Sequence, residues 1–253
     1  MKIIPVPAFE DNYIWLISDG RYAAAVDPGD AEPVLDYLGR HGLRLAAILN
    51  THHHRDHTGG NAALLRHGKV PVFGPRGENI STVTHPVGEG DAVQLPELGA
   101  AFKVIDVPGH TAGHVAYYGA NSLFCGDALF ACGCGKLFEG TPAQMFVSLG
   151  KFAALPDDTR VYCAHEYTLE NILFAKLVEP GNLALQERET HDLQTREQGL
   201  PTLPSTIALE KATNPFLRWD KPGVIDAAET FAKRSLADPV SVFAAIREFR
   251  NTF

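Results

Sequence analysis

Short apolar segments alternate with Gly- and Pro-containing turns over the first two thirds of the chain. Runs of this length, rich in β-branched and aromatic side chains, are typical of strands. The strands predicted in this way are residues 1–7, 14–17, 22–26, 45–49, 102–107, 115–118, 122–125 and 160–163. Helical patterns lie between them at residues 60–66 and 142–154, and Asp30 is expected to cap a further helix that ends at Gly42. Strands interleaved with helices predict a sheet covered by helices, which is a layered α/β architecture.

The pattern changes after His165. Apolar residues recur at helical spacing over residues 168–178 and 239–250, and a polar helix is predicted over residues 182–198. A proline-rich connection follows the polar helix and separates it from the predicted helix at residues 239–250. The chain is therefore expected to form one domain over residues 1–165 and a second, mostly helical domain over residues 166–253.

The charge balance limits the possible partners. The chain has 22 basic and 30 acidic side chains, which gives a net charge of -8. Affinity for nucleic acids comes mainly from neutralised phosphates, so the chain is not expected to bind them. No apolar run approaches the roughly 20 residues that span a bilayer. The N-terminal residues lack the features of a signal peptide, and we expect a cytoplasmic protein that does not bind membranes. A monomer is the default expectation for its oligomeric state.

Four cysteines are too few for a disulfide scaffold in a chain of 253 residues, and reduced thiols are expected. The Cys132-Gly133-Cys134 segment has no second cysteine pair at zinc-finger spacing. We interpret it as a loop of small residues rather than a metal site.

The chain has eleven histidines, and the densest run extends from Thr51 to His57. It directly follows the predicted strand at residues 45–49, and ligands of open α/β sheets bind at such strand ends. In an extended loop, His52 and His54 project in the same direction, and Asp56 and His57 follow on the turn. Imidazole and carboxylate donors at this density predict a site for zinc, iron or manganese. The alternative is a His-rich surface loop; a purification tag would lie at a terminus and would lack the aspartate.

Three further donors follow predicted strands: His110, Asp127 and His165. Each signal is weak alone, because a Gly-Asp pair is usually a turn and a lone histidine is usually hydrogen-bonded. Because all three follow strands, as the histidine run does, we expect one sheet edge to gather them.

With these motifs together, the chain resembles the metallo-β-lactamase superfamily and, within it, the glyoxalase II (hydroxyacylglutathione hydrolase) family. The superfamily motifs are His52-x-His54-x-Asp56-His57, Pro108-Gly109-His110-Thr111, Gly126-Asp127 and His165-Glu166-Tyr167. The subfamily motifs are Asp11-Asn12-Tyr13, the segment from Cys134 to Gly140, and Arg247 with Arg250. The resemblance covers essentially the whole chain. It implies an αββα sandwich with a C-terminal helical domain that binds glutathione.

The resemblance also implies two metal ions per chain, with zinc expected and iron or manganese as alternatives. His52, His54 and His110 would bind the first ion, Asp56, His57 and His165 the second, and Asp127 would bridge both. His114 is expected to pack against or orient its loop. Asp27 is either an acceptor for a ligand imidazole or a plain turn residue. The remaining histidines are expected on the surface or behind the ligands: His41, His53, His67, His85 and His191.

Two metal ions that share a bridging hydroxide need no serine or cysteine nucleophile. The hydroxide, held between ions that Asp56 and Asp127 bind, would attack a thioester carbonyl. The resemblance implies hydrolysis of S-D-lactoylglutathione to glutathione and D-lactate, the second step of methylglyoxal detoxification. Gly-x-Ser-x-Gly is absent, which argues against an α/β-hydrolase esterase.

Glutathione carries two carboxylates, so its site needs cations or N–H donors. The resemblance implies that Lys136, Arg247 and Arg250 bind its glycine end and that Tyr167 donates its hydroxyl. Arg247 and Arg250 lie one helical turn apart, where cations also favour a helix C-terminus. Many family members carry tyrosine at the position of Phe138, and the missing hydroxyl would weaken binding by about 1 kcal/mol.

Other readings of the same fold are a lactonase, a β-lactamase, a nuclease and an iron-dependent oxygen-handling enzyme. The β-lactamases lack the bridging aspartate, the nucleases need a basic surface, and the flavodiiron type has glutamate at the position of His54. A persulfide dioxygenase with one iron would lack part of the set Asp56, His57 and His165. A non-enzymatic metal-binding module would not need the three cations Lys136, Arg247 and Arg250 to bind an anionic ligand.

Overall fold

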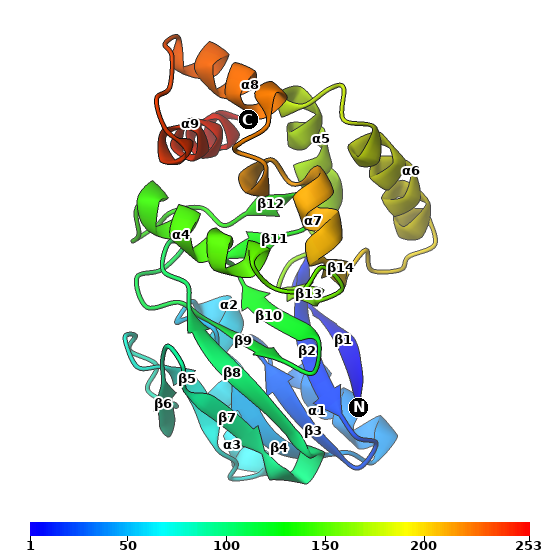
Figure 1. Cartoon of the computed structure of the whole chain (residues 1–253). Coiled ribbons are helices and arrows are strands. Elements are labelled where there is room, and N and C mark those ends of the chain that lie inside the picture. Colours follow the sequence, from blue (N-terminus) through cyan, green and yellow to red (C-terminus); the bar gives the residue numbers. More distant parts are fainter. The chain divides into compact units, whose positions relative to one another are not determined.

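The computed structural model describes all 253 residues, which form two compact units (Figure 1). The first unit contains Met1–Asp106, Ala112–Gly126 and Tyr162–His165. The second contains Val107–Thr111, Asp127–Val161 and Glu166–Phe253. Each unit is therefore assembled from segments that are separated along the chain.

A mixed six-stranded sheet organises the first unit, in the order β1-β2-β3-β4-β5-β6. Its strands are β1 (Lys2–Ala8), β2 (Asn12–Ser18), β3 (Tyr22–Val26), β4 (Arg44–Leu49), β5 (Val72–Pro75) and β6 (His85–Val87). The first three strands are antiparallel, and β3 to β6 are parallel. The parallel pairing places the loop after β4 at the carboxyl edge of this part of the sheet.

Two helices of the first unit, α1 (Glu32–His41) and α3 (Asn61–His67), cover one face of this sheet. Val34 and Leu38 of α1 and Leu64 of α3 pack in one core cluster with Ile14 and Leu16 of β2. Side chains alternate along a strand, so the residue between Ile14 and Leu16 faces the opposite side of the sheet. That residue, Trp15, makes an edge-to-face contact with Tyr162, and the ring of Tyr162 stacks on Phe124.

Phe124 belongs to a second sheet, whose strands in the first unit form an antiparallel meander. These strands are β7 (Ala92–Leu95), β8 (Ala100–Asp106), β9 (Val115–Gly119) and β10 (Ser122–Gly126), with the 3₁₀ turn η1 (Pro96–Leu98) between β7 and β8. The aromatic contacts of Phe124 and Tyr162 therefore fill the core between two stacked sheets. The two sheets agree with the αββα sandwich that the family resemblance implied. The single sheet expected from the strand pattern alone is wrong, because that pattern does not show where the chain changes sheets.

The second unit is mostly helical. Its helices are α4 (Pro142–Ala153), α5 (Thr168–Val178), α6 (Leu183–Glu197), α7 (Ile207–Thr213), α8 (Pro222–Ala232) and α9 (Pro239–Thr252), with the 3₁₀ turn η2 (Pro215–Leu217). A small hairpin of β11 (Leu129–Phe130) and β12 (Gly133–Cys134) lies among them, and the first half of β13 (Arg160–Cys163) pairs with β14 (Ser205–Thr206). Thr141 and Gln144 form a capping box at the start of α4.

The predicted strands and helices are present, with differences at their ends. Gly42 ends α1 in the left-handed conformation, as predicted. The predicted N-cap is wrong: Ala31 caps α1, and Asp30 instead accepts a hydrogen bond from the Glu32 amide. The expected loop at Cys132-Gly133-Cys134 is partly wrong, because Gly133 and Cys134 form β12. Neither two-residue strand of this hairpin is long enough to give a period-two pattern.

No helix of the chain combines the length and the apolar composition that a membrane span requires.

Candidate metal centre and cationic pocket

The histidine run follows β4 and leads into the short helix α2 (Arg55–Thr58). His52 and His57 are fully buried. The candidate ligand atoms of Asp56, His57 and His165 all lie within 4.8 Å of one another. Those of His52 lie within the same distance of those of His54 and of His57. The first unit thus gathers five of the seven predicted ligands.

Hydrogen bonds on the Nδ1 side orient these imidazoles. Thr51 donates its hydroxyl hydrogen to Asp27, so its oxygen accepts from His52 Nδ1 at 3.0 Å. His165 Nδ1 lies 2.7 Å from an Asp11 carboxylate oxygen, and His57 Nδ1 lies 3.2 Å from Asp27. A proton held on Nδ1 leaves the lone pair of the ring on Nε2, which is the usual arrangement behind a metal-binding histidine. Asp27 is more than a plain turn residue, because it accepts hydrogen bonds from the Thr51 amide and hydroxyl and lies at ion-pair distance from His57 Nδ1.

The other two predicted ligands, His110 and Asp127, belong to the second unit. His110 Nε2 lies 3.4 Å from a carboxylate oxygen of Asp127, and His110 Nδ1 lies 2.8 Å from the Lys136 carbonyl oxygen. Gly135 allows the close approach of these segments, since an added Cβ would lie 1.9 Å from the Asp127 carbonyl oxygen. His110 therefore follows the same pattern, with Nδ1 on an acceptor.

The donor set fits divalent metal ions. Buried imidazole nitrogens and carboxylate oxygens at this spacing are the ligands of zinc, and also of iron and manganese. The predicted ligands follow β4, β8, β10 and β13, and β4 belongs to a different sheet from the other three strands. The expectation that one sheet edge gathers all of them is therefore wrong.

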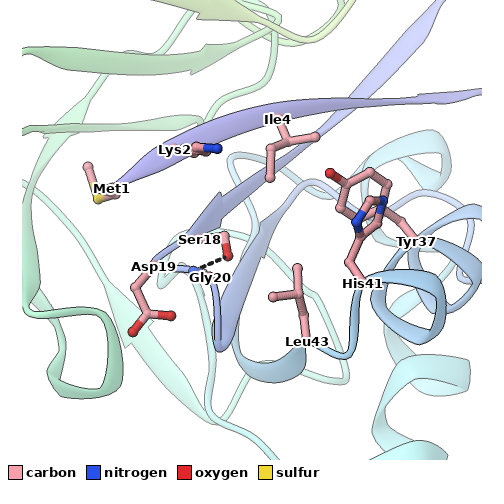
Figure 2. Close-up of a pocket in the computed structure, with 9 residues that line it drawn as sticks. All are labelled: Met1, Lys2, Ile4, Ser18, Asp19, Gly20, Tyr37, His41 and Leu43. Atoms are coloured by element: carbon pink, nitrogen blue, oxygen red, sulfur yellow. Dashed lines mark hydrogen bonds between the residues drawn. The ribbon is translucent and has the colours of Figure 1, made fainter.

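The remaining histidines have other surroundings. His114 is fully buried and stacks on His52, and His53 Nδ1 contacts Glu78 at 2.9 Å. Figure 2 shows His41 in a different pocket, of about 400 Å³, where its ring stacks on Tyr37. Asp19 of that pocket accepts hydrogen bonds from two amides of its own turn. With a single imidazole, this pocket lacks the donor set of a metal site.

A pocket of about 270 Å³ lies in the second unit. Its lining residues are Phe130, Cys134, Lys136, Tyr167, Asn171, Arg247, Arg250 and Asn251. Four of the five predicted substrate-binding residues are among them. Three cationic side chains around one small cavity favour an anionic ligand.

The two arginines of α9 differ in their partners. Arg247 is buried, donates to the Cys134 carbonyl oxygen at 2.7 Å and to Asn251, and lies over the Phe216 ring. Its Nε is also buried and has no hydrogen-bond partner. Arg250 donates to Glu170 at 2.6 Å near the surface. Arg247 is therefore held by buried groups of the protein, whereas the ion-pair partner of Arg250 is an exposed carboxylate and its guanidinium lies over the Phe174 and Phe253 rings.

Phe138, the fifth predicted residue, does not line the pocket. Its ring is mostly exposed, contacts the His110 ring edge-to-face, and lies 5.4 Å from the Lys136 ammonium. Its place beside a candidate metal ligand could not be read from the sequence.

Two further residues of the candidate sites are not evident from the sequence. Asp11 stands out only as part of a family motif, and Asn171 lines the pocket without belonging to any motif. Asn171 lies four residues after Tyr167, so helical spacing would have placed both on one face of α5.

Burial raises the pKa of the Cys134 thiol, although the neighbouring Arg247 guanidinium lowers it in part. Cys134 is nevertheless a pocket-lining residue, and all four cysteines of the chain are buried free thiols. At neutral pH, Cys134 therefore contributes a neutral, weakly polar surface to the pocket.

Replacement of Asp11 tests the orienting role of its carboxylate. We expect Asp11→Ala to weaken metal binding roughly 10- to 100-fold, because His165 loses the acceptor that fixes its tautomer and ring orientation. Metal affinity is measured by competition with a chromophoric chelator, which does not depend on activity. Glu10→Ala, an exposed neighbour, is the matched control. Unchanged metal affinity in Asp11→Ala would contradict the role.

Two protein-family models match the chain, one after the other. The family model "Metallo-beta-lactamase superfamily" matches residues 8–165, and "Hydroxyacylglutathione hydrolase C-terminus" matches residues 166–253. A hydroxyacylglutathione hydrolase of Nitrosomonas europaea is 55% identical over 253 residues, which are 100% of this chain and 97% of the relative.

Solved structures with the same fold include ETHE1 from Myxococcus xanthus, with 26% identity and a TM-score of 0.66. That match covers 100% of this chain and 99% of the other. TTHA1623, crystallised in a di-iron-bound form, has 26% identity and a TM-score of 0.60, over 86% of this chain and 100% of the other.

Proposed function

Because this chain belongs to the hydroxyacylglutathione hydrolase (glyoxalase II) family of the metallo-β-lactamase superfamily, we propose that it hydrolyses S-D-lactoylglutathione to glutathione and D-lactate. Family membership makes the chain a thioester hydrolase whose substrate is a glutathione thioester. The structural observation that supports a glutathione thioester as the substrate is the cationic pocket of the second unit.

The pocket fits the glycine end of glutathione. Lys136 and Arg250 would bind its carboxylate, since the ion-pair partner that Arg250 would exchange for it is an exposed glutamate. Arg247 would contribute its Nε and its charge while its other nitrogens hold the pocket wall. Tyr167, whose ring packs on Phe130, would donate its hydroxyl. Phe138 would provide apolar contact only.

For the metal centre, we keep the ligand set that the sequence predicted. His52, His54 and His110 would hold one ion, Asp56, His57 and His165 the other, and Asp127 would bridge them. Two bound divalent ions would lower the pKa of a water molecule and supply the nucleophile for the thioester carbonyl. Zinc is the expected metal, and iron is the alternative that the di-iron form of TTHA1623 supports.

The chain's own residues contribute orientation and charge. Thr51, Asp27 and Asp11 hold the ligand imidazoles in one tautomer, so that the site is organised before substrate binds. The cations of the pocket would hold glutathione by its carboxylate while the thiolate leaves. Residues 1–165 would form the catalytic domain and residues 166–253 the glutathione-binding domain of a cytoplasmic monomer.

The first test is hydrolysis of S-D-lactoylglutathione by the purified chain, before and after treatment with a chelator. We expect rapid hydrolysis that the chelator abolishes and zinc restores, because the candidate metal centre contains no serine or cysteine that could replace a metal-bound nucleophile. The reaction is followed by the loss of thioester absorbance and by the release of free thiol. A chain that holds two metal ions and hydrolyses a lactone but not this thioester would contradict the proposal in favour of a lactonase.

A further inference from the structure

A buried cluster of charged side chains lies in the second unit, and none of its members is a predicted site residue. It consists of Arg188 and Asp192 of α6 and Glu210 of α7, each at most 4% exposed. Arg188 Nη1 lies 2.8 Å from Glu210 Oε1, and Arg188 Nε donates to Asp192 at 3.2 Å. Buried ion pairs add little net stability compared with apolar packing. The role of this cluster is therefore sought in the groups that it contacts, not in its contribution to the free energy of unfolding.

The second carboxylate oxygen of Glu210 faces the β11–β12 hairpin (residues 129–134). It accepts hydrogen bonds from the Cys132 amide and from Asn214 Nδ2, both at 2.9 Å. The same Asn214 amide group donates to the carbonyl oxygens of Phe130 at 3.1 Å and Gly133 at 2.9 Å. Cys132 has a φ of 56°, a conformation that a residue with a side chain adopts only when its surroundings hold it there. Glu210 and Asn214 thus clamp the tip of the hairpin.

The hairpin forms one wall of the cationic pocket. Phe130 and Cys134 line the cavity, and the Cys134 carbonyl oxygen accepts the 2.7 Å hydrogen bond from Arg247. The aromatic contact of Tyr167 is also made with Phe130. A shift of the hairpin would therefore move the partners of two predicted glutathione-binding residues at once.

We propose that Glu210 is a positioning residue for glutathione: Arg188 holds one of its carboxylate oxygens, and the other fixes the Cys132 amide and with it the pocket wall that sets Arg247. The inference rests on the proposed function, because it takes the cationic pocket as the glutathione site. Glu210 does not line the cationic pocket, so it would act through the hairpin and not by contact with glutathione.

Only a carboxylate satisfies this arrangement. Oε1 accepts from Arg188 and from the Ser205 hydroxyl, and Oε2 accepts from Cys132 and Asn214. Both sides of the group therefore present donors. A glutamine would turn its NH₂ group toward one of the two sides, where donors would face each other.

The test compares Glu210→Gln and Asn214→Ala with the wild-type holoenzyme. We expect KM for S-D-lactoylglutathione to rise at least five-fold in both variants, while kcat stays within two-fold and the metal content is unchanged. The Kd for glutathione itself, measured by calorimetry, should rise by the same factor. Asn214→Ala leaves the charges of the cluster in place, so it tests the clamp even if Glu210→Gln does not fold.

Asp192→Asn is the matched control, because it weakens the same cluster on the side away from the hairpin. We expect it to lower Tm and to leave KM and the glutathione Kd unchanged. If Glu210→Gln and Asn214→Ala also lower Tm without a change in KM or Kd, the cluster is structural only and the inference is wrong. A wild-type chain that does not bind glutathione would overturn the proposed function as well.

Discussion

Asp127→Ala is expected to reduce kcat/KM for S-D-lactoylglutathione at least 100-fold, a loss of roughly 3 kcal/mol or more in transition-state stabilisation. Asp127 is buried, and its carboxylate lies 3.4 Å from His110 Nε2 in the second unit. In the proposed site, it is the only ligand that both metal ions share. Its removal takes away one donor from each ion and the negative charge that holds the two cations close together.

The metal content should fall together with the rate. We expect Asp127→Ala to retain at most one equivalent of metal per chain after dialysis, measured by inductively coupled plasma mass spectrometry. Asp36→Ala, which removes a half-exposed carboxylate from α1, is the control and should keep two equivalents and full activity. An Asp127→Ala chain with two metal ions and normal turnover would refute the bridged site.

The second large effect is expected for Arg247→Ala combined with Arg250→Ala. A hydrogen bond to a charged group is worth about 1.5 to 3 kcal/mol, so the loss of both arginines should raise KM roughly 100-fold or more. The metal content should remain at the wild-type value, because neither arginine is a predicted ligand. Steady-state kinetics and metal analysis on the same sample separate the two effects.

The single variants distinguish the two arginines. Arg250→Ala should lower Tm less than Arg247→Ala does, since its ion-pair partner Glu170 is exposed and its other contacts are with the Phe174 and Phe253 rings. Arg247→Ala should also lower Tm, because the Cys134 carbonyl oxygen loses its buried donor. Arg234→Ala removes one exposed positive charge of the second unit and should change neither quantity. Loss of metal from the double variant would show that the assigned roles are wrong.

Elements with a strong local pattern could be predicted from the sequence. The strand Tyr22–Val26 and the helix Thr168–Val178 have their predicted bounds, because apolar periodicity and flanking turn residues agree there. The two sheets were expected only from the family resemblance. The local pattern could not predict the pairing of their strands, since it depends on contacts such as Trp15 with Tyr162, far apart in the chain. The β11–β12 hairpin was missed because side chains of distant helices, such as Asn214, hold it.

The candidate site shows the same limit. Its metal-binding residue types could be listed because they follow strands in recognisable motifs. Their supporting acceptors, Asp11, Asp27 and the Lys136 carbonyl oxygen, become apparent only in three dimensions. Residues that act through the backbone, such as Glu210 on the Cys132 amide, leave no local pattern in the sequence.

The buried thiols have a consequence for an enzyme that works in a pool of glutathione. Disulfide exchange requires a thiolate, and burial raises the pKa of Cys132 to about 12 and that of Cys134 above its usual value. If the cationic pocket binds glutathione as proposed, oxidised glutathione there would meet a protonated thiol at Cys134, and a mixed disulfide would form slowly. The proposed binding pocket would thus stay unmodified when the glutathione pool becomes oxidised.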